Sequence, residues 1–210
     1  MARRSRPARW QTILVVVANP FASKQLAATK AAGIAKRWGA PVVLFNAFMV
    51  PQPVNDVPMG SREQIIASAI RQREQQLRGI ASRVRLPRNT QHIVRWDYPI
   101  YEAIIRQVRK TRPNLVIADS HREGKLARLV LANTDWQLIR ECPCPLWFVR
   151  AGGLPRAQRV LVAVDPRHTH AKPAKLDDRL LQAARVVERQ LGGRISLVHA
   201  YETPASAVPG

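Results

Sequence analysis

Thr12 to Pro20 reads T-I-L-V-V-V-A-N-P, and Arg159 to Pro166 reads R-V-L-V-A-V-D-P. Aligned on their prolines, the two segments match in nearly every apolar position. A second apolar segment follows in each half, G-A-P-V-V-L-F-N-A-F from Gly39 and G-R-I-S-L-V-H-A-Y from Gly193. Self-similarity at this long period indicates a duplicated domain rather than a solenoid of short repeats. We therefore expect one complete domain and the beginning of a second copy.

This duplication predicts four parts: a basic arm at 1–10, a first domain at 11–150, a linker at 151–157 and a partial second domain at 158–210. The first domain is long enough to bury its own core, whereas two strands and a helix are too few to be stable alone. No apolar run reaches the ~20 residues that a bilayer requires, so we expect no membrane span. The basic N-terminus is not followed by the apolar region of a signal peptide, and none is predicted.

Apolar runs and helical patterns alternate through the first domain. We expect strands at 13–17, 42–47, 92–96, 115–118 and 146–149, and helices at 22–38, 61–83, 99–108 and 125–140. Gly39 is expected to end the first helix, and Ser61-x-x-Gln64 has the form of a capping box. The alternation predicts an α/β fold, a doubly wound parallel sheet with helices on both faces. Ligands of such folds bind outside the carboxyl ends of the strands, here at the loops 18–23 and 119–125.

The chain is strongly basic, with a formal net charge of +20. Residues 1–150 hold 25 Lys and Arg against 9 Asp and Glu, and residues 151–210 hold 9 against 5. The arginines from Arg62 to Arg95 are spread singly, which is typical of a solvated face. No aromatic interleaving, recognition-helix pattern or zinc-finger spacing accompanies them. Nucleic-acid binding therefore stays open as an alternative that rests on charge alone.

Neither the cysteines nor the histidines form a metal-ligand pattern. Cys142 and Cys144 in C-P-C-P have neither the C-x-x-C spacing nor a second pair, so we interpret them as a helix end and a strand start in a reducing cytosol. His168 and His170 form an H-x-H without further ligands. We predict no metal site.

Four local sequences stand out: V-V-V-A-N from Val15, V-L-V-A-V-D from Val160, N-L-V-I-A-D-S-H from Asn114 and C-P-L-W-F-V from Cys144. Together they resemble the universal stress protein family. The segment T-D-W-Q-L-I-R-E-C-P-C-P-L-W, from Thr134, is similar to the first domain of the E-type tandem members. The resemblance implies a five-stranded sheet in the order 3-2-1-4-5, of the adenine-nucleotide alpha hydrolase type. It also implies a cytoplasmic bacterial protein that supports stress resistance, including resistance to DNA damage in the E-type branch.

The family's nucleotide-binding members carry a glycine signature after the fourth strand: Gly, two residues, Gly, nine residues, Gly, then Ser or Thr. Glycines let backbone N–H groups approach phosphate oxygens closely. Counted back from Cys144-Pro145, the three glycine positions are Asp119, Arg122 and Ala132 here, Asn133 takes the Ser/Thr place, and Gly124 is off register. The resemblance thus implies a degenerate nucleotide site without ATP as a cofactor.

The family's first strand ends in an aspartate, which is Asn19 in the first domain and Asp165 in the second. The candidate nucleotide-site positions are therefore Asn19, Asp119, Ser120, His121, Arg122, Gly124, Asn133 and Asp165. An alternative is a small-molecule module in which His121 and Arg122 contact an anion.

The adjacent Asp119, Ser120 and His121 do not predict a catalytic triad, because neighbours in a tight loop rarely face one another with that geometry. We interpret them as a polar loop that caps the next helix, and we predict that the chain is not an enzyme.

The fifth strand, Leu146-Trp147-Phe148-Val149, is expected at the edge of the sheet. It carries no charge, proline or bulge to prevent pairing with another chain. We therefore predict a homodimer through these four residues.

Overall fold

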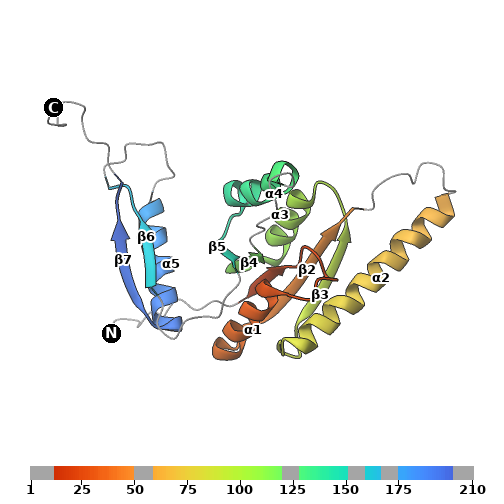
Figure 1. The fold of residues 1–210 in the computed structure, drawn as a ribbon, viewed down its shortest axis with the longest axis horizontal. Helices are drawn as coiled ribbons and strands as arrows, with labels where there is room; N and C mark the ends of the chain where they lie inside the picture. The colour runs from red at the N-terminus through yellow and green to blue at the C-terminus, as the bar shows by residue number, and fades with distance from the viewer. Residues whose placement is uncertain (1–11, 50–58, 120–127, 151–158, 167–174, 201–210) are drawn as a thin grey trace, which may run out of the picture. The chain divides into compact units, whose positions relative to one another are not determined.

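Strands and helices alternate along the first part of the chain in the computed structural model (Figure 1). The structure describes residues 12–49, 59–119, 128–150, 159–166 and 175–200. Two compact units divide the chain: Arg9–Gly152, and Gly153–Gly210 with the first eight residues. The elements of the first unit are β1 (Ile13–Val16), α1 (Leu26–Trp38), β2 (Val42–Phe48), α2 (Met59–Arg83), β3 (Gln91–Trp96), α3 (Ile100–Thr111), β4 (Leu115–Asp119), α4 (Arg128–Glu141) and β5 (Leu146–Val149).

These five strands form one parallel sheet in the order β3-β2-β1-β4-β5, which confirms the predicted fold class and strand order. All four residues of β1 and all seven of β2 are buried. Continuous β-branched and apolar runs are typical of such strands, because a parallel sheet is covered on both faces. Among the described strands, β5 pairs with β4 alone, with Val116 opposite Leu146 and Asp119 opposite Val149, and it therefore lies at the edge as expected.

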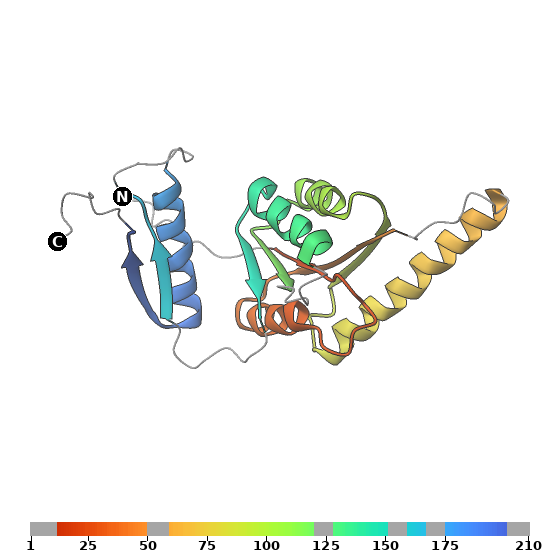
Figure 2. The same ribbon diagram turned by 45° about the horizontal axis from the view of Figure 1, so that its top comes forward.

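The helices cover both faces of the sheet. α1 and α2 lie on one face, and α3 and α4 lie on the other (Figures 1 and 2). On the second face, Ile104, Ile105 and Val108 of α3 join Leu138 of α4 against the sheet, and all four are buried. The helix predicted at 99–108 thus packs its apolar side chains against one face of the sheet.

α1 begins four residues later than the sequence pattern suggested, at Leu26 instead of residue 22. The intervening residues form a compact loop, in which the amide of Gln25 donates to the carbonyl oxygens of Asn19 and Ala22, both at 2.9 Å. The predicted end of the helix is correct: Gly39 adopts a left-handed conformation at φ 63°, and its N–H donates to the Ala35 carbonyl oxygen. Such a φ favours glycine because it has no Cβ.

α2 begins at Met59, two residues before the predicted capping box. Ser61 is therefore inside the helix and cannot be its N-cap, so the capping-box interpretation was wrong. The 25-residue helix buries Leu77 and Ile80 completely, whereas Ile65 near its beginning is exposed. Only the second half of α2 thus contributes to the core of the first unit.

The second unit holds β6 (Arg159–Ala163), α5 (Leu176–Leu191) and β7 (Arg194–Val198). The two strands pair in parallel, with Val160 opposite Ile195 and Val162 opposite Leu197. They form a separate two-stranded sheet. α5 packs on both strands. Among the described residues of this unit, Val162 of β6 and Ala184 of α5 are buried.

Candidate functional site

A pocket of about 120 Å³ lies at the carboxyl ends of β1 and β4, where the strand order changes direction. Ligands of doubly wound folds bind at this switch point. The pocket is lined by Val16, Val17, Ala18, Ala47, Ala118 and Asp119 from the sheet edge and by Ile100, Ile104, Thr134, Asp135 and Leu138 from α3 and α4. Its walls are therefore mainly apolar, with a hydroxyl and two carboxyl groups as polar groups.

Asp119, the last residue of β4, has a defined role at the pocket. Its Oδ1 accepts a hydrogen bond of 2.7 Å from the backbone N–H of Ala27, in the first turn of α1. The first N–H groups of a helix have no partner within the helix and attract anions. α1 has no acidic residue in its own first turn, so a carboxylate 92 positions along the chain supplies the negative charge.

The loop between β1 and α1 is held by its own hydrogen bonds. Asn19 Oδ1 accepts a 3.0 Å bond from the Phe21 N–H, and the Asn19 carbonyl oxygen accepts from Gln25. Gln25 is buried, and its amide links the beginning of the loop to the beginning of α1. The side-chain oxygen of Asn19 therefore stabilises the turn after β1, and Asn19 is not among the residues that line the pocket.

The predicted site positions are only partly brought together. Asp119 lines the pocket, and Asn133 lies in α4 next to the lining residue Thr134. Ser120, His121, Arg122 and Gly124 lie outside the described residues. Asp165 belongs to the second unit, where it follows β6 and its N–H lies 3.5 Å from Asp177 Oδ1.

Sequence reasoning missed Thr134 and Asp135 as pocket residues. They directly follow Asn133, which takes the Ser/Thr place of the family signature. Projecting α4 as a helix from that position would have placed the next residues at the same sheet edge, because a helix rises only ~1.5 Å per residue.

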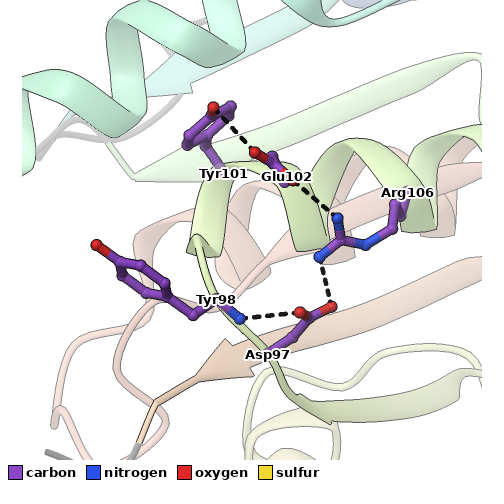
Figure 3. A network of polar contacts seen from close by, with 5 residues as sticks. All are labelled: Asp97, Tyr98, Tyr101, Glu102 and Arg106. Atoms are coloured by element: carbon purple, nitrogen blue, oxygen red, sulfur yellow. Dashed lines mark hydrogen bonds and ion pairs between the residues drawn. The ribbon is translucent and has the colours of Figure 1, made fainter.

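A polar network fixes the connection between β3 and α3 (Figure 3). The Arg106 guanidinium lies 2.7 Å from Asp97 Oδ2 and 3.0 Å from Glu102 Oε2. The Tyr98 N–H donates to Asp97 Oδ1 at 2.8 Å, and the Tyr101 hydroxyl donates to Glu102 at 3.2 Å. The bond to Asp97 raises the pKa of Arg106, and the bond to Glu102 raises the pKa of Tyr101. The network orients the first two turns of α3, which supply Ile100 and Ile104 to the pocket.

The two cysteines lie together where α4 ends and β5 begins. Their sulfur atoms are 3.8 Å apart, and both thiols are free and half-buried. The hydrogen bond from Cys144 lowers the pKa of Cys142 to about 7, whereas the same pairing and burial raise the pKa of Cys144. At neutral pH Cys142 is therefore the more nucleophilic thiol.

Within the described ranges, no three His, Cys, Asp or Glu side chains are grouped so that they could hold a metal ion. His168 and His170 are outside those ranges. No helix in the described part of the chain has the length and apolar character needed to cross a membrane.

Comparison with known proteins agrees with this geometry. The family model described as the universal stress protein family matches residues 9–150. Universal stress protein E of Photorhabdus laumondii is 33% identical over 108 residues, covering 50% of this chain and 34% of that protein. Universal stress protein E of Escherichia coli K12 is 30% identical over 107 residues, with the same coverage. The matched part of the chain thus spans about a third of the length of these curated relatives.

A solved structure supports the fold. The universal stress protein from Archaeoglobus fulgidus DSM 4304 aligns with a TM-score of 0.59 at 14% identity, over 92% of this chain and 68% of that one. Because the family model covers more than half of the sequence, the chain belongs to the universal stress protein family, and its relatives by sequence are of the E type.

Proposed function

We propose that this universal stress protein acts without catalysis and that its first unit keeps the nucleotide-binding fold without binding ATP tightly. The observation that carries the proposal is the hydrogen bond from Ala27 N–H to Asp119 Oδ1. A carboxylate already neutralises the helix N-terminus at the switch point, and it repels a triphosphate. Two unit charges 4 Å apart interact by about 1 kcal/mol even at the dielectric constant of water, and by more where water is excluded.

The charge of the pocket supports the same proposal. Two carboxylates, Asp119 and Asp135, are among the lining groups of the pocket at β1 and β4. Carboxylates at this position disfavour a chain of phosphates.

Titration calorimetry with ATP and Mg²⁺ on the full chain tests this function. We expect no binding in the low micromolar range. Asp119→Asn removes the charge and keeps an oxygen that can accept from Ala27, whereas Asp178→Asn removes an equal charge from the exposed surface of α5. Weak ATP binding that strengthens with Asp119→Asn and not with Asp178→Asn would support electrostatic exclusion. A low micromolar dissociation constant for the wild type would refute the proposal.

A small-molecule module is the second candidate. An engineered apolar cavity of about 150 Å³ binds benzene, so a pocket of this size suits one small neutral or cationic ring. Thermal shift measurements with adenine and ATP separate the two functions. Stabilisation by adenine but not by ATP would favour a ring-binding module, and stabilisation by neither would favour action through protein contacts.

A homodimer through β5 fits the same function. β5 is an edge strand of the sheet that the described residues form, and Trp136 and Ile139 of the preceding helix α4 are exposed apolar side chains. Analytical ultracentrifugation at tens of micromolar should therefore give a dimer. Trp147→Lys should dissociate it, since lysine on an edge strand opposes pairing, whereas Met49→Lys should not. A wild type that sediments as a monomer would contradict the dimer.

Stress resistance in the cytoplasm, including resistance to DNA damage, is the cellular role that we propose from the resemblance to E-type members noted in the sequence. The test uses a strain from which the gene for this protein has been deleted and measures its survival after ultraviolet irradiation. Full rescue by the plasmid-borne gene is expected. If the gene leaves survival unchanged, the DNA-damage role is excluded, while the ATP experiment is unaffected.

A further inference from the structure

Aromatic residues lie at the carboxyl ends of two neighbouring strands of the first unit and in the loop after a third. Phe48 is the last residue of β2 and Trp96 the last of β3, and the register pairs them directly. Phe21 follows β1, which is the next strand in the sheet. Paired residues on parallel strands lie about 4.8 Å apart and point to the same face. Phe48 is buried, but Phe21 is 47% exposed and Trp96 is 40% exposed.

Two arginines of α2 stack on these rings. The Arg73 guanidinium carbon lies 3.9 Å from the centre of the Phe48 ring and 5.4 Å from that of Phe21. Arg62 lies near the beginning of α2, and its guanidinium carbon is 5.6 Å from the centre of the Trp96 ring. We call this group, Phe21, Arg73, Phe48, Trp96 and Arg62, the arginine–aromatic row.

Neither guanidinium group of the row is paired with a carboxylate among the described residues, and Glu74, the neighbour of Arg73, contacts Arg78. A guanidinium that stacks on rings with its faces can still donate from its N–H groups to an oxyanion. Arg73 Nε is buried and has no hydrogen-bond partner in the described part of the chain. The terminal Nη groups of Arg73 are therefore the donors that a phosphate would contact, while stacking holds the side chain in place.

Local hydrogen bonds support the ends of the row. The turn in which Phe21 N–H donates to Asn19 Oδ1 positions Phe21. Asp97, held by Arg106, accepts from the N–H of Tyr98, which follows Trp96 closely and is 68% exposed. In Figure 3 the Tyr98 ring points away from this network. An ordered main chain therefore presents three exposed rings at one edge of the sheet.

From this arrangement we propose that the arginine–aromatic row binds single-stranded nucleic acid. Exposed rings stack on unpaired bases, and arginines between them contact the phosphates. The charge favours this occupant over a basic or neutral peptide: α2 carries five arginines against two glutamates, and the chain has a net charge of +20. The row contains none of the residues that line the pocket at β1 and β4, so this inference does not depend on ATP exclusion.

Fluorescence anisotropy of the full chain tests the proposal with a labelled oligo(dT) of about 20 nucleotides and a duplex of equal length. We expect the single strand to bind more tightly than the duplex. Phe21→Ala combined with Trp96→Ala should weaken single-strand binding about tenfold or more, since each stacked base contributes substantially. Both side chains are exposed enough for the variant to fold, which circular dichroism and a thermal melt verify.

Leu161→Ala is the control, because Leu161 is an apolar side chain that is 68% exposed on β6 and belongs neither to the row nor to the surface proposed for the dimer. It should leave binding unchanged. Arg62→Gln should reduce the slope of log affinity against log salt by about 0.7, the value for one phosphate contact on a single strand. Equal affinity for single strand and duplex, or equal loss in Leu161→Ala and the double variant, would overturn the proposal and leave only nonspecific charge attraction.

Discussion

The two compact units contain versions of the same strand, but they bury it to different extents. Aligned on the prolines, Val15 of β1 corresponds to Leu161 of β6. Val15 is 0% exposed, whereas Leu161 is 68% exposed. β1 has a strand on each side and helices over both faces, whereas β6, within the described residues, pairs with β7 alone and packs on α5. The apolar pattern therefore predicts a strand, and the neighbouring elements decide whether it is buried.

This difference extends to the stability expected of each unit. In the first unit, β1, β2 and β4 place a continuous set of side chains at or near zero exposure. In the second, Leu161, Leu197 and Val198 remain exposed among the described residues. Exposed apolar groups of this kind contribute little to folding and mark surfaces that other protein segments cover.

The largest effect is expected from one substitution made in both units. Leu14→Ala removes a fully buried side chain from β1 and should lower the free energy of unfolding by about 2–5 kcal/mol, because it leaves a cavity. Leu161→Ala, the same chemical change at the exposed position in β6, should cost less than about 0.5 kcal/mol. Chemical denaturation followed by circular dichroism measures both. Equal losses would show that Leu161 is covered in solution.

A smaller effect is expected at the beginnings of the helices. α1 receives its N-terminal carboxylate from Asp119, whereas α5 has Asp177 and Asp178 in its own first turn. Asp119→Ala should therefore destabilise the first unit by about 0.5–2 kcal/mol, as the loss of a helix cap does. Asp178→Ala should cost less, because its neighbour Asp177 remains. Thermal melts compare the two variants. If Asp119→Ala leaves the stability unchanged, Asp119 does not cap α1, and the argument for ATP exclusion loses its basis.

Much of the fold could be predicted because it depends on local patterns. β5 was predicted at the residues where it is found, Leu146–Val149, since a short apolar run lies between prolines and a polar segment. The strand order and the edge position of β5 were also correct. The start of α1 was predicted too early. Hydrogen bonds from the Gln25 amide hold the preceding residues in a loop, although their composition is compatible with a helix. Side-chain ties of this kind compete with helix formation and leave the apolar pattern unchanged.

The candidate site was less predictable because its contacts join distant segments. The bond between Asp119 and Ala27 spans 92 residues, and no local pattern indicates it. The arginine–aromatic row was missed for the same reason. In the sequence, Phe48 and Trp96 are 48 residues apart, and the absence of interleaved aromatics counted against nucleic-acid binding. The sheet register places the two rings side by side, with α2 supplying the arginines. The fold therefore brings aromatic and arginine side chains together although they are not interleaved in the sequence.

The smallest expected effect concerns the thiols, which report on the first unit alone because the chain has two cysteines and both lie there. The Cys144 S–H stabilises the Cys142 thiolate and lowers its pKa from 9.0 to about 7. The rate of alkylation by iodoacetamide should therefore rise with pH around a midpoint near 7, since the thiolate is the nucleophile. Cys144→Ala removes the donor while burial still opposes the charge, so the midpoint should move upward and the rate at neutral pH should fall. Cys142→Ala should abolish the fast-reacting site. If the midpoint stays near 7 without Cys144, the hydrogen bond between the two sulfur atoms is not what activates Cys142.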